Sequence, residues 1–100
     1  MNVMMLRGTV KPEHAEETTA AVETMFAALE KARPAGVHYA SLGLPDGVTF
    51  VVLLALDEGV DGNPLTTVPE FVEFQENLRD WLAGPPSPEQ LTVIGSYALF

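Results

Sequence analysis

The chain has 100 residues, 47% of them hydrophobic and 19% charged, and this composition predicts one globular domain over residues 1–100. Fourteen acidic against five basic residues give a net charge of −9, which repels phosphate backbones and anionic lipid, so no nucleic-acid or membrane partner is expected. Because cysteine is absent, a disulfide framework and a thiolate nucleophile are excluded. Met1–Leu6 is apolar but is followed by Arg7 and lacks a cleavage site, so we expect a soluble cytoplasmic protein.

The first third of the chain predicts a strand followed by a helix. Asn2–Val10 is mostly apolar, and Pro12 stands where proline is tolerated at the start of a helix. Acidic residues then precede basic ones, as the helix dipole favours, until Pro34 and Gly36 end the helix. Apolar residues recur at spacings of three, four and seven, which predicts one buried stripe of Ala15, Val22, Met25, Phe26 and Leu29.

The middle of the chain predicts a β-hairpin of strands Val37–Leu44 and Val48–Leu56. A three-residue loop would pair Leu44 with Val48 and put His38 opposite Leu54, leaving Tyr39 on the other face. A two-residue loop made of Asp46 and Gly47 would reverse the faces, so both registers stay open at this point.

The second hairpin strand carries the strongest architectural signal. Val48–Leu56 is apolar at every position except Thr49, whereas a sheet with one wet face alternates apolar and polar side chains. Both faces of this sheet therefore need cover. Since the chain offers two helices for one face, the sequence predicts that a second copy of the protein closes the other.

The last third predicts a helix and a final strand. Thr67-Val68-Pro69-Glu70 matches a capping box, and the apolar stripe behind it consists of Phe71, Phe74, Leu78, Trp81 and Leu82. Gly84 and the following prolines end the helix, and Leu91–Phe100 is predicted to be the last strand. The acidic loop starting at Asp57 lacks the calcium-loop ligands at its third and twelfth positions, so no metal site is expected.

The order strand, helix, strand, strand, helix, strand predicts the α+β class. A split βαβ arrangement of this kind, the ferredoxin-like βαββαβ fold, forms a four-stranded antiparallel sheet with both helices on one face.

With this order of elements, the chain resembles the dimeric α+β barrel superfamily, and within it the antibiotic-biosynthesis monooxygenase-like domains. The resemblance covers nearly the whole chain, including Val10-Lys11-Pro12 after the first strand and the Pro45-Asp46-Gly47 hairpin. It implies that two subunits pair sheet to sheet into a barrel, and that a small aromatic or polyketide-like molecule binds between sheet and helices.

The sequence departs from the family pattern at two places. Monooxygenase-like members often close the third strand with a glutamate and an aromatic residue, where this chain has Leu54-Ala55-Leu56-Asp57. The haem-degrading branch binds iron through a histidine in the second helical region, and no histidine occurs between Thr67 and Gly84. No cofactor is therefore expected, and the resemblance carries the fold further than the activity.

Four residues are candidate ligand-binding residues. His38 could act as a general base or hold a ligand hydroxyl, or it could be a structural histidine bonded to the backbone. Trp81 could wall a pocket beside His38, although its helical spacing favours core packing. Tyr39 could donate a phenol or lie at a subunit interface. Arg7, a charge within an apolar strand, could bind a ligand carboxylate or form a structural ion pair.

The sequence leads to two hypotheses of function. The first is a small homodimeric protein of unknown activity that binds a hydrophobic or aromatic molecule between sheet and helices. The second is a cofactor-independent monooxygenase acting on an aromatic substrate, with His38 or Tyr39 beside the substrate. Because few polar residues are expected to face the cavity, the binding protein is favoured, and the sequence does not decide whether catalysis occurs.

Overall fold

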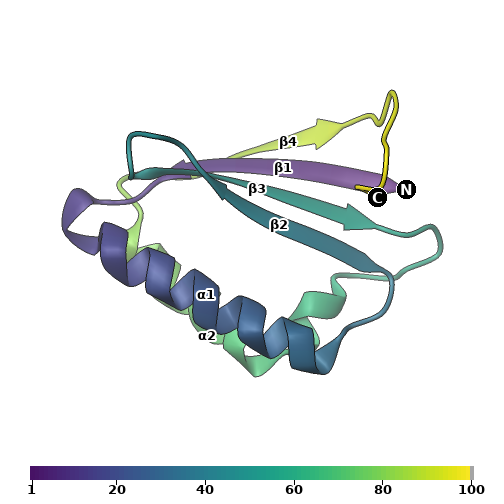
Figure 1. Cartoon of the computed structure of the whole chain (residues 1–100), viewed down its shortest axis with the longest axis horizontal. Coiled ribbons are helices and arrows are strands. Elements are labelled where there is room, and N and C mark those ends of the chain that lie inside the picture. The colour runs from purple at the N-terminus through teal and green to yellow at the C-terminus, as the bar shows by residue number, and fades with distance from the viewer. Residues whose placement is uncertain (100) are drawn as a thin grey trace.

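The computed structural model describes residues 1–99 and places the predicted elements in the predicted order (Figure 1). The elements of this part of the chain are β1 Asn2–Thr9, α1 Ala15–Ala32, β2 Val37–Gly43, β3 Thr49–Leu56, α2 Pro69–Trp81 and β4 Ser87–Leu91. Short 3₁₀ turns over Pro12–His14 and Pro64–Thr67 precede the two helices. None of the helices among residues 1–99 is long and apolar enough to cross a membrane.

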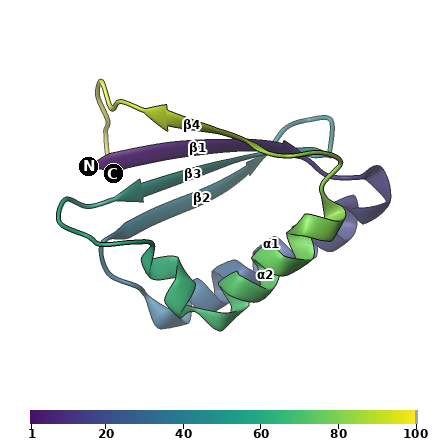
Figure 2. The same cartoon turned by 180° about the vertical axis from the view of Figure 1, so that it is seen from behind.

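The four strands form one antiparallel sheet in the order β2-β3-β1-β4. Both helices lie side by side on the same face of this sheet, as two opposite views show (Figures 1 and 2). The predicted α+β, ferredoxin-like architecture is therefore confirmed. The face of the sheet away from the helices, called the outer face below, carries no helix in residues 1–99.

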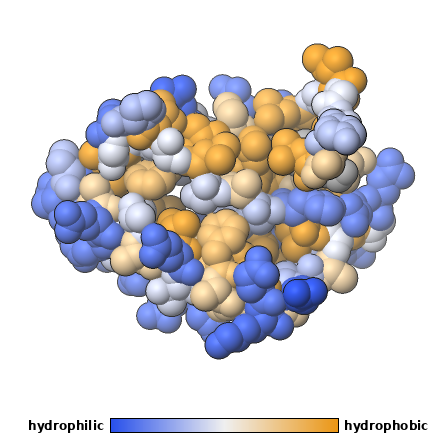
Figure 3. All heavy atoms as spheres, in the orientation of Figure 1, coloured by the Kyte–Doolittle hydropathy of each residue, from blue (hydrophilic) through white to orange (hydrophobic). Residues whose placement is uncertain are grey.

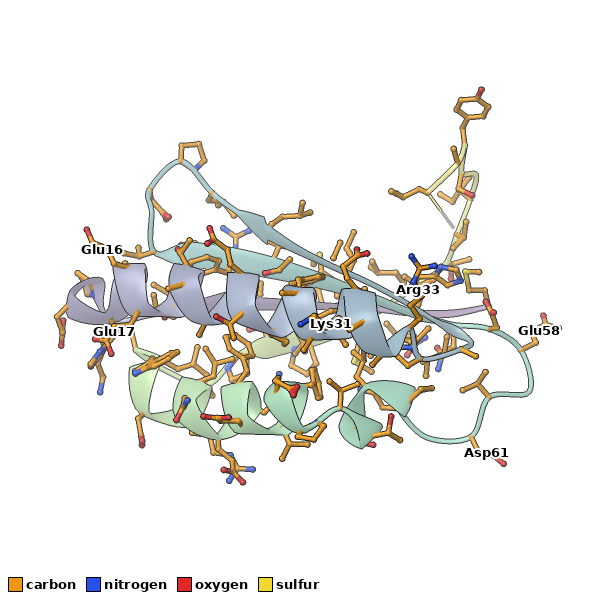
Figure 4. All side chains as sticks on the ribbon, turned by 60° about the horizontal axis from the view of Figure 1, so that its bottom comes forward. Glu16, Glu17, Lys31, Arg33, Glu58 and Asp61 are labelled. Carbon is orange, nitrogen blue, oxygen red and sulfur yellow. The ribbon has the colours of Figure 1, made fainter. Side chains whose placement is uncertain are left out.

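Helix α1 follows the predicted pattern. Glu16 and Glu17 lie in its first turn and Lys31 in its last, so the charges oppose the helix dipole, and Figure 4 shows the two groups at opposite ends. Arg33 ends the helix in the left-handed conformation (φ 46°), and its N–H donates to the Leu29 carbonyl at 2.8 Å. The apolar stripe packs on α2, with Met25 only 1% exposed.

The tightly packed core is formed mainly by the helical layer. Its buried members come from α1, from the 3₁₀ turn before α2 and from α2: Met25, Leu65, Val68, Phe71 and Phe74. The sheet adds only partly buried side chains to this cluster: Val37, Tyr39 and Leu54. Met4 and Leu6 of β1 and Phe50 and Val52 of β3 share that helix-facing side but stay partly exposed.

The hairpin register differs by one residue from the preferred prediction. Tyr39, rather than His38, lies opposite Leu54, and His38 lies opposite Ala55. The loop has four residues because the Leu44 N–H donates to the Thr49 carbonyl at 2.9 Å. This loop is built around Asp46, whose carboxylate accepts hydrogen bonds from the N–H groups of Val48 and Thr49 and from the Thr49 hydroxyl. The one-residue change moves His38 to the outer face.

Two predictions about the last third are wrong. The capping box is absent, because Thr67 lies in the preceding 3₁₀ turn, its hydroxyl donates to the Pro64 carbonyl, and Val68 is the N-cap of α2. The last strand is Ser87–Leu91 rather than Leu91–Phe100, of which Phe100 lies outside the described residues. Proline is tolerated there because β4 is an edge strand.

The outer face is apolar and incompletely covered. Its middle is lined by partly buried side chains from three strands: Met5, Ala40, Val51 and Leu53. Leu42, at the β2 edge of the same face, is 50% exposed. Val3 and Ala55, near one end of the face, are buried. The expectation that the helices leave this face uncovered is correct.

Candidate functional site

A groove opens between the second half of α1 and the edge strand β2. Its volume is about 490 Å³, and we call it the Tyr39 groove. Its lining residues are Phe26, Leu29, Glu30, Arg33, Pro34, Val37, Tyr39 and Leu65. Figure 3 looks onto this side of the molecule and shows hydrophobic surface reaching from the sheet towards the helices, surrounded by hydrophilic side chains. A groove of this size and lining suits a small, mostly apolar molecule.

Tyr39 lies in an aromatic cluster inside this groove. Its ring stacks on Phe26 with centroids 5.4 Å apart and meets the edge of Phe71 at 6.0 Å. Burial raises the pKa of the Tyr39 phenol to about 12, so the hydroxyl is neutral near pH 7. Within residues 1–99 the Tyr39 hydroxyl has no hydrogen-bond partner, and its oxygen is not fully buried. It can therefore donate a hydrogen bond to a bound molecule, but it cannot serve as a base.

The rim of the groove carries its charges. Glu30 and Arg33 are exposed at the end of α1, and the Arg33 Nε donates to the Glu30 carbonyl at 3.3 Å. Figure 4 shows Arg33 at the end of the helix, on the side towards the sheet. The acidic residues Glu58 and Asp61, in the loop after β3, extend away from the molecule in the same view. One cation and one carboxylate thus lie at the rim of the groove.

His38 is separated from the Tyr39 groove by the sheet. It belongs to the outer face, where its Nε2 lies 3.1 Å from a carboxylate oxygen of Asp57 and its side chain is 42% exposed. Neighbouring residues of a strand point to opposite faces, so His38 and Tyr39 cannot contact one ligand inside the groove. The structure does not bring His38 and Trp81 together in one pocket.

Trp81 is the last residue of α2 and packs against the helical core. Its ring stacks on His14, with centroids 6.2 Å apart, and His14 in turn lies 2.9 Å from a Glu17 carboxylate oxygen. Because His14 precedes α1 whereas the groove lies at the helix's far end, Trp81 does not line the groove. These contacts favour the core-packing interpretation of Trp81.

Arg7 lies on the outer face opposite Val51 and is exposed. It forms no ion pair within the described residues. Its charge nevertheless contributes to lowering the pKa of Asp46, after the larger effects of the hydrogen bonds from Thr49 and Val48. Arg7 thus lies on the other side of the sheet from the Tyr39 groove.

Sequence reasoning missed Phe26 and Arg33 as groove residues. Phe26 was assigned to the buried stripe, because helical spacing does not distinguish a packed core position from a cavity wall. Arg33 and Pro34 line the groove at the end of α1, where Arg33 has a φ of 46°, and the sequence indicated only that the helix ends there. A second hollow of about 350 Å³ lies between α1 and Gly47, with small and acidic lining. No three histidine or carboxylate side chains in residues 1–99 gather as a metal would require.

The fold and groove define a ferredoxin-like α+β domain with a space between sheet and helices. The chain matches no protein-family model and no curated protein by sequence. Solved structures do match it. A protein described as "Putative antibiotic biosynthesis monooxygenase from Nitrosomonas europaea" superposes with a TM-score of 0.78 at 18% identity, covering 95% of this chain and 100% of the other.

Two further structures are similar over almost the whole chain. A protein described as "putative Antibiotic biosynthesis monooxygenase" from Chloroflexus aurantiacus has a TM-score of 0.74 at 10% identity, over 99% of this chain and 98% of the other. Rv0793 from Mycobacterium tuberculosis has a TM-score of 0.71 at 14% identity, over 97% and 98%. The chain therefore has the fold of antibiotic biosynthesis monooxygenase-like proteins, as the resemblance implied.

Proposed function

We propose that the protein is a cytoplasmic homodimer that binds a small aromatic or hydrophobic molecule in the Tyr39 groove. The observation that carries this proposal is the stack of Phe26 and Tyr39 on an open groove of about 490 Å³. A planar ligand can extend such a stack, and aromatic pairs are favourable by about 1 kcal/mol beyond their buried area.

The polar groups of the groove narrow the chemistry of the ligand. The neutral Tyr39 hydroxyl donates a hydrogen bond, and Arg33 offers a cation at the rim. A ligand with an aromatic body and one acceptor or anionic group matches both.

The homodimer rests on the outer face. An apolar sheet face of this extent is uncommon on a monomer, and a second copy is the partner whose surface has the same composition. Sheet-to-sheet pairing would bury Leu42 and its neighbours and leave the helices outside. Sedimentation equilibrium at micromolar concentration should give twice the mass of one chain, and a stable monomer would contradict the proposal.

The ligand site can be tested with 8-anilinonaphthalene-1-sulfonate, an aromatic anion that fluoresces when it binds apolar sites. Phe26→Ala should weaken its binding about five- to tenfold, since one aromatic stack is lost. Val72→Ala, an exposed change on α2, serves as the control. Amide chemical shifts should move at Leu29, Val37 and Tyr39. If they move elsewhere, or if Phe26→Ala has no effect, the groove is not the site.

A second function, cofactor-independent oxygenation of an aromatic substrate, is supported by the descriptions of the similar structures. Such chemistry needs a group that takes up the substrate proton. Tyr39 is a poor base at pH 7, and His38 lies behind the sheet. The binding function is therefore preferred. Oxygen uptake with phenolic aromatic substrates tests the alternative, and uptake abolished by Tyr39→Phe would favour it.

A further inference from the structure

The Tyr39 groove has an aromatic end and a charged end. Phe26, Glu30 and Arg33 line it from α1 and from the residue that ends this helix. They are spaced by four and three residues, and residues at this spacing share one face of a helix. Seven helical residues rise about 10 Å, which separates the aromatic end at Phe26 from the charged end at Arg33. Tyr39 of β2 stacks on Phe26 and so belongs to the aromatic end.

The charged end combines an acid and a base that are not paired. Of the eight residues that line the groove, Glu30 and Arg33 are the two that carry charge. Within residues 1–99 neither side chain forms an ion pair, with the other or with a further residue. The Arg33 Nε donates to the main-chain carbonyl of Glu30 at 3.3 Å, which ties the guanidinium to the last turn of the helix. Because a guanidinium has five N–H donors, the others are available to a carboxylate.

The charge balance at this end opposes a ligand that has a net charge. Arg33 attracts an anion, but the Glu30 carboxylate, the negative end of the α1 dipole and the net charge of −9 of the chain repel it. A simple cation is attracted by these groups and repelled by Arg33. A ligand that carries both an ammonium and a carboxylate offers each side chain the opposite charge and is itself neutral overall.

We infer that the Tyr39 groove binds an aromatic α-amino acid. Its ring stacks with Phe26 and Tyr39, its carboxylate pairs with Arg33, and its ammonium pairs with Glu30. This inference rests on the groove of the proposed function and adds the amine, which that function does not require. Glu30 lies about 6 Å along the helix from Phe26, so the ring and the charged groups must be close together. A single methylene between the ring and the α-carbon provides this spacing.

The aromatic end should make the site selective among amino acids. A third ring can extend the stack of Phe26 and Tyr39, whereas an aliphatic side chain gains burial alone. Phe71 borders the same end, because its ring and that of Tyr39 meet edge to face with centroids 6.0 Å apart. L-Phenylalanine should therefore bind about fivefold more tightly than L-leucine. Equal affinities would overturn the inference.

Three phenyl compounds that differ in their charged groups test the assignment of the head group. L-Phenylalanine carries both charges, 3-phenylpropionate lacks the ammonium, and 2-phenylethylamine lacks the carboxylate. Amide chemical shifts of Leu29, Val37 and Tyr39, followed during titration near pH 7, give the three dissociation constants. L-Phenylalanine should bind at least about fivefold more tightly than either analogue, since each analogue loses one charged contact. If 3-phenylpropionate binds as tightly as L-phenylalanine, the ammonium contributes nothing and the inference is wrong.

Two single substitutions should give opposite patterns with these compounds. Arg33→Gln should weaken the binding of L-phenylalanine and 3-phenylpropionate about fivefold and strengthen that of 2-phenylethylamine. Glu30→Gln should weaken the binding of L-phenylalanine and 2-phenylethylamine by a similar factor and strengthen that of 3-phenylpropionate. A variant that failed to fold would lose all three ligands, so a gain for one ligand beside a loss for another reports the contact itself.

Lys31→Gln and Glu23→Gln are the matched controls. They remove the same two kinds of charge from exposed positions of α1 that do not line the groove. Their dissociation constants should stay within about twofold of those of the wild type. If the control variants reproduced the effects of Arg33→Gln and Glu30→Gln, the overall charge of the protein would set the affinity, and the inference would be overturned.

The outcomes separate the amino-acid ligand from the proposed function. If 8-anilinonaphthalene-1-sulfonate binds through Phe26 but L-phenylalanine does not bind or has no advantage over 3-phenylpropionate, the groove is a ligand site for another class of molecule. If neither the dye nor any phenyl compound moves the amides of the groove, both proposals are refuted. Tightest binding of L-phenylalanine with the opposite patterns of the two variants would support both.

Discussion

The two layers of the molecule contain similar apolar side chains but bury them differently. In the helical layer Met25, Leu65 and Phe71 are enclosed by residues of the same chain. In the sheet, most apolar side chains on both faces stay partly exposed, although Val3 and Ala55 at one end of the outer face are buried. The helical layer buries its core within one chain, whereas the sheet leaves apolar surface exposed.

A matched pair of methionines measures this difference. Met25→Ala should lower the free energy of unfolding by about 3 kcal/mol, since it leaves a cavity among helical residues. Met5→Ala on the partly buried outer face should cost about 1 kcal/mol in the monomer. Urea denaturation at low protein concentration gives both values. Equal losses would show that the outer face is as well packed as the helical core.

Tyr39 connects the two layers, and its titration should report how closed the groove is. Its pKa is raised from 10.0 to about 12 because burial disfavours the phenolate. The group therefore contributes stability that is fully present below pH 10 and lost as the pH rises through 12, roughly 2–3 kcal/mol in total. Tyr39→Phe should remove this alkaline loss.

The chain itself supplies the control for that titration. It contains two tyrosines, so in a Tyr97→Phe variant the absorbance near 295 nm reports the Tyr39 phenolate alone. An apparent pKa near 10 in the folded variant would mean that the groove admits water freely around Tyr39, and that its lining is not a dry site.

A charge placed on the outer face should weaken the proposed dimer but should hardly change the stability of one chain. Leu42→Asp should raise the dimer dissociation constant about 30-fold, because a carboxylate would be buried at the proposed interface without a partner. Leu42 is already half exposed, so the unfolding free energy of the monomer should change by less than about 0.5 kcal/mol. Sedimentation equilibrium and urea denaturation separate the two effects, and an unaltered dimer would place the interface elsewhere.

The sequence predicted the helical layer better than the sheet, for a physical reason. Helical spacing depends on neighbours within one element, so the stripe through Met25 and Phe74 could be identified without knowing the fold. The hairpin register depends on loop length, and the pattern did not reveal that Asp46 would close a four-residue loop. The end of β4 depends on where β1 begins, which is a relation between distant segments.

The candidate site was predicted only in part for the same reason. Tyr39 was identified, but a one-residue change of register put it in the groove and moved His38 to the outer face. In the structure Trp81 packs against the core, as its helical spacing indicated. Arg7 is exposed on the outer face of the sheet. The groove itself is lined by residues of α1 and β2, and no local pattern encodes how these two elements lie relative to each other.

The Asp46 carboxylate accepts hydrogen bonds within the loop that joins β2 and β3, and its substitution should have the smallest effect. Hydrogen bonds from the Thr49 hydroxyl and from two backbone N–H groups lower the pKa of its carboxyl below the ordinary 3.8. The ionised form is thus favoured in the folded state, so its contribution is present above that pH and lost as the pH falls further. In wild type the urea midpoint should therefore drop between about pH 6 and about pH 3 by more than in Asp46→Ala. Asp61→Asn, in the exposed loop, should behave as wild type does. A drop unaltered by Asp46→Ala would mean that the loop geometry, rather than this carboxylate, holds β2 and β3 in register.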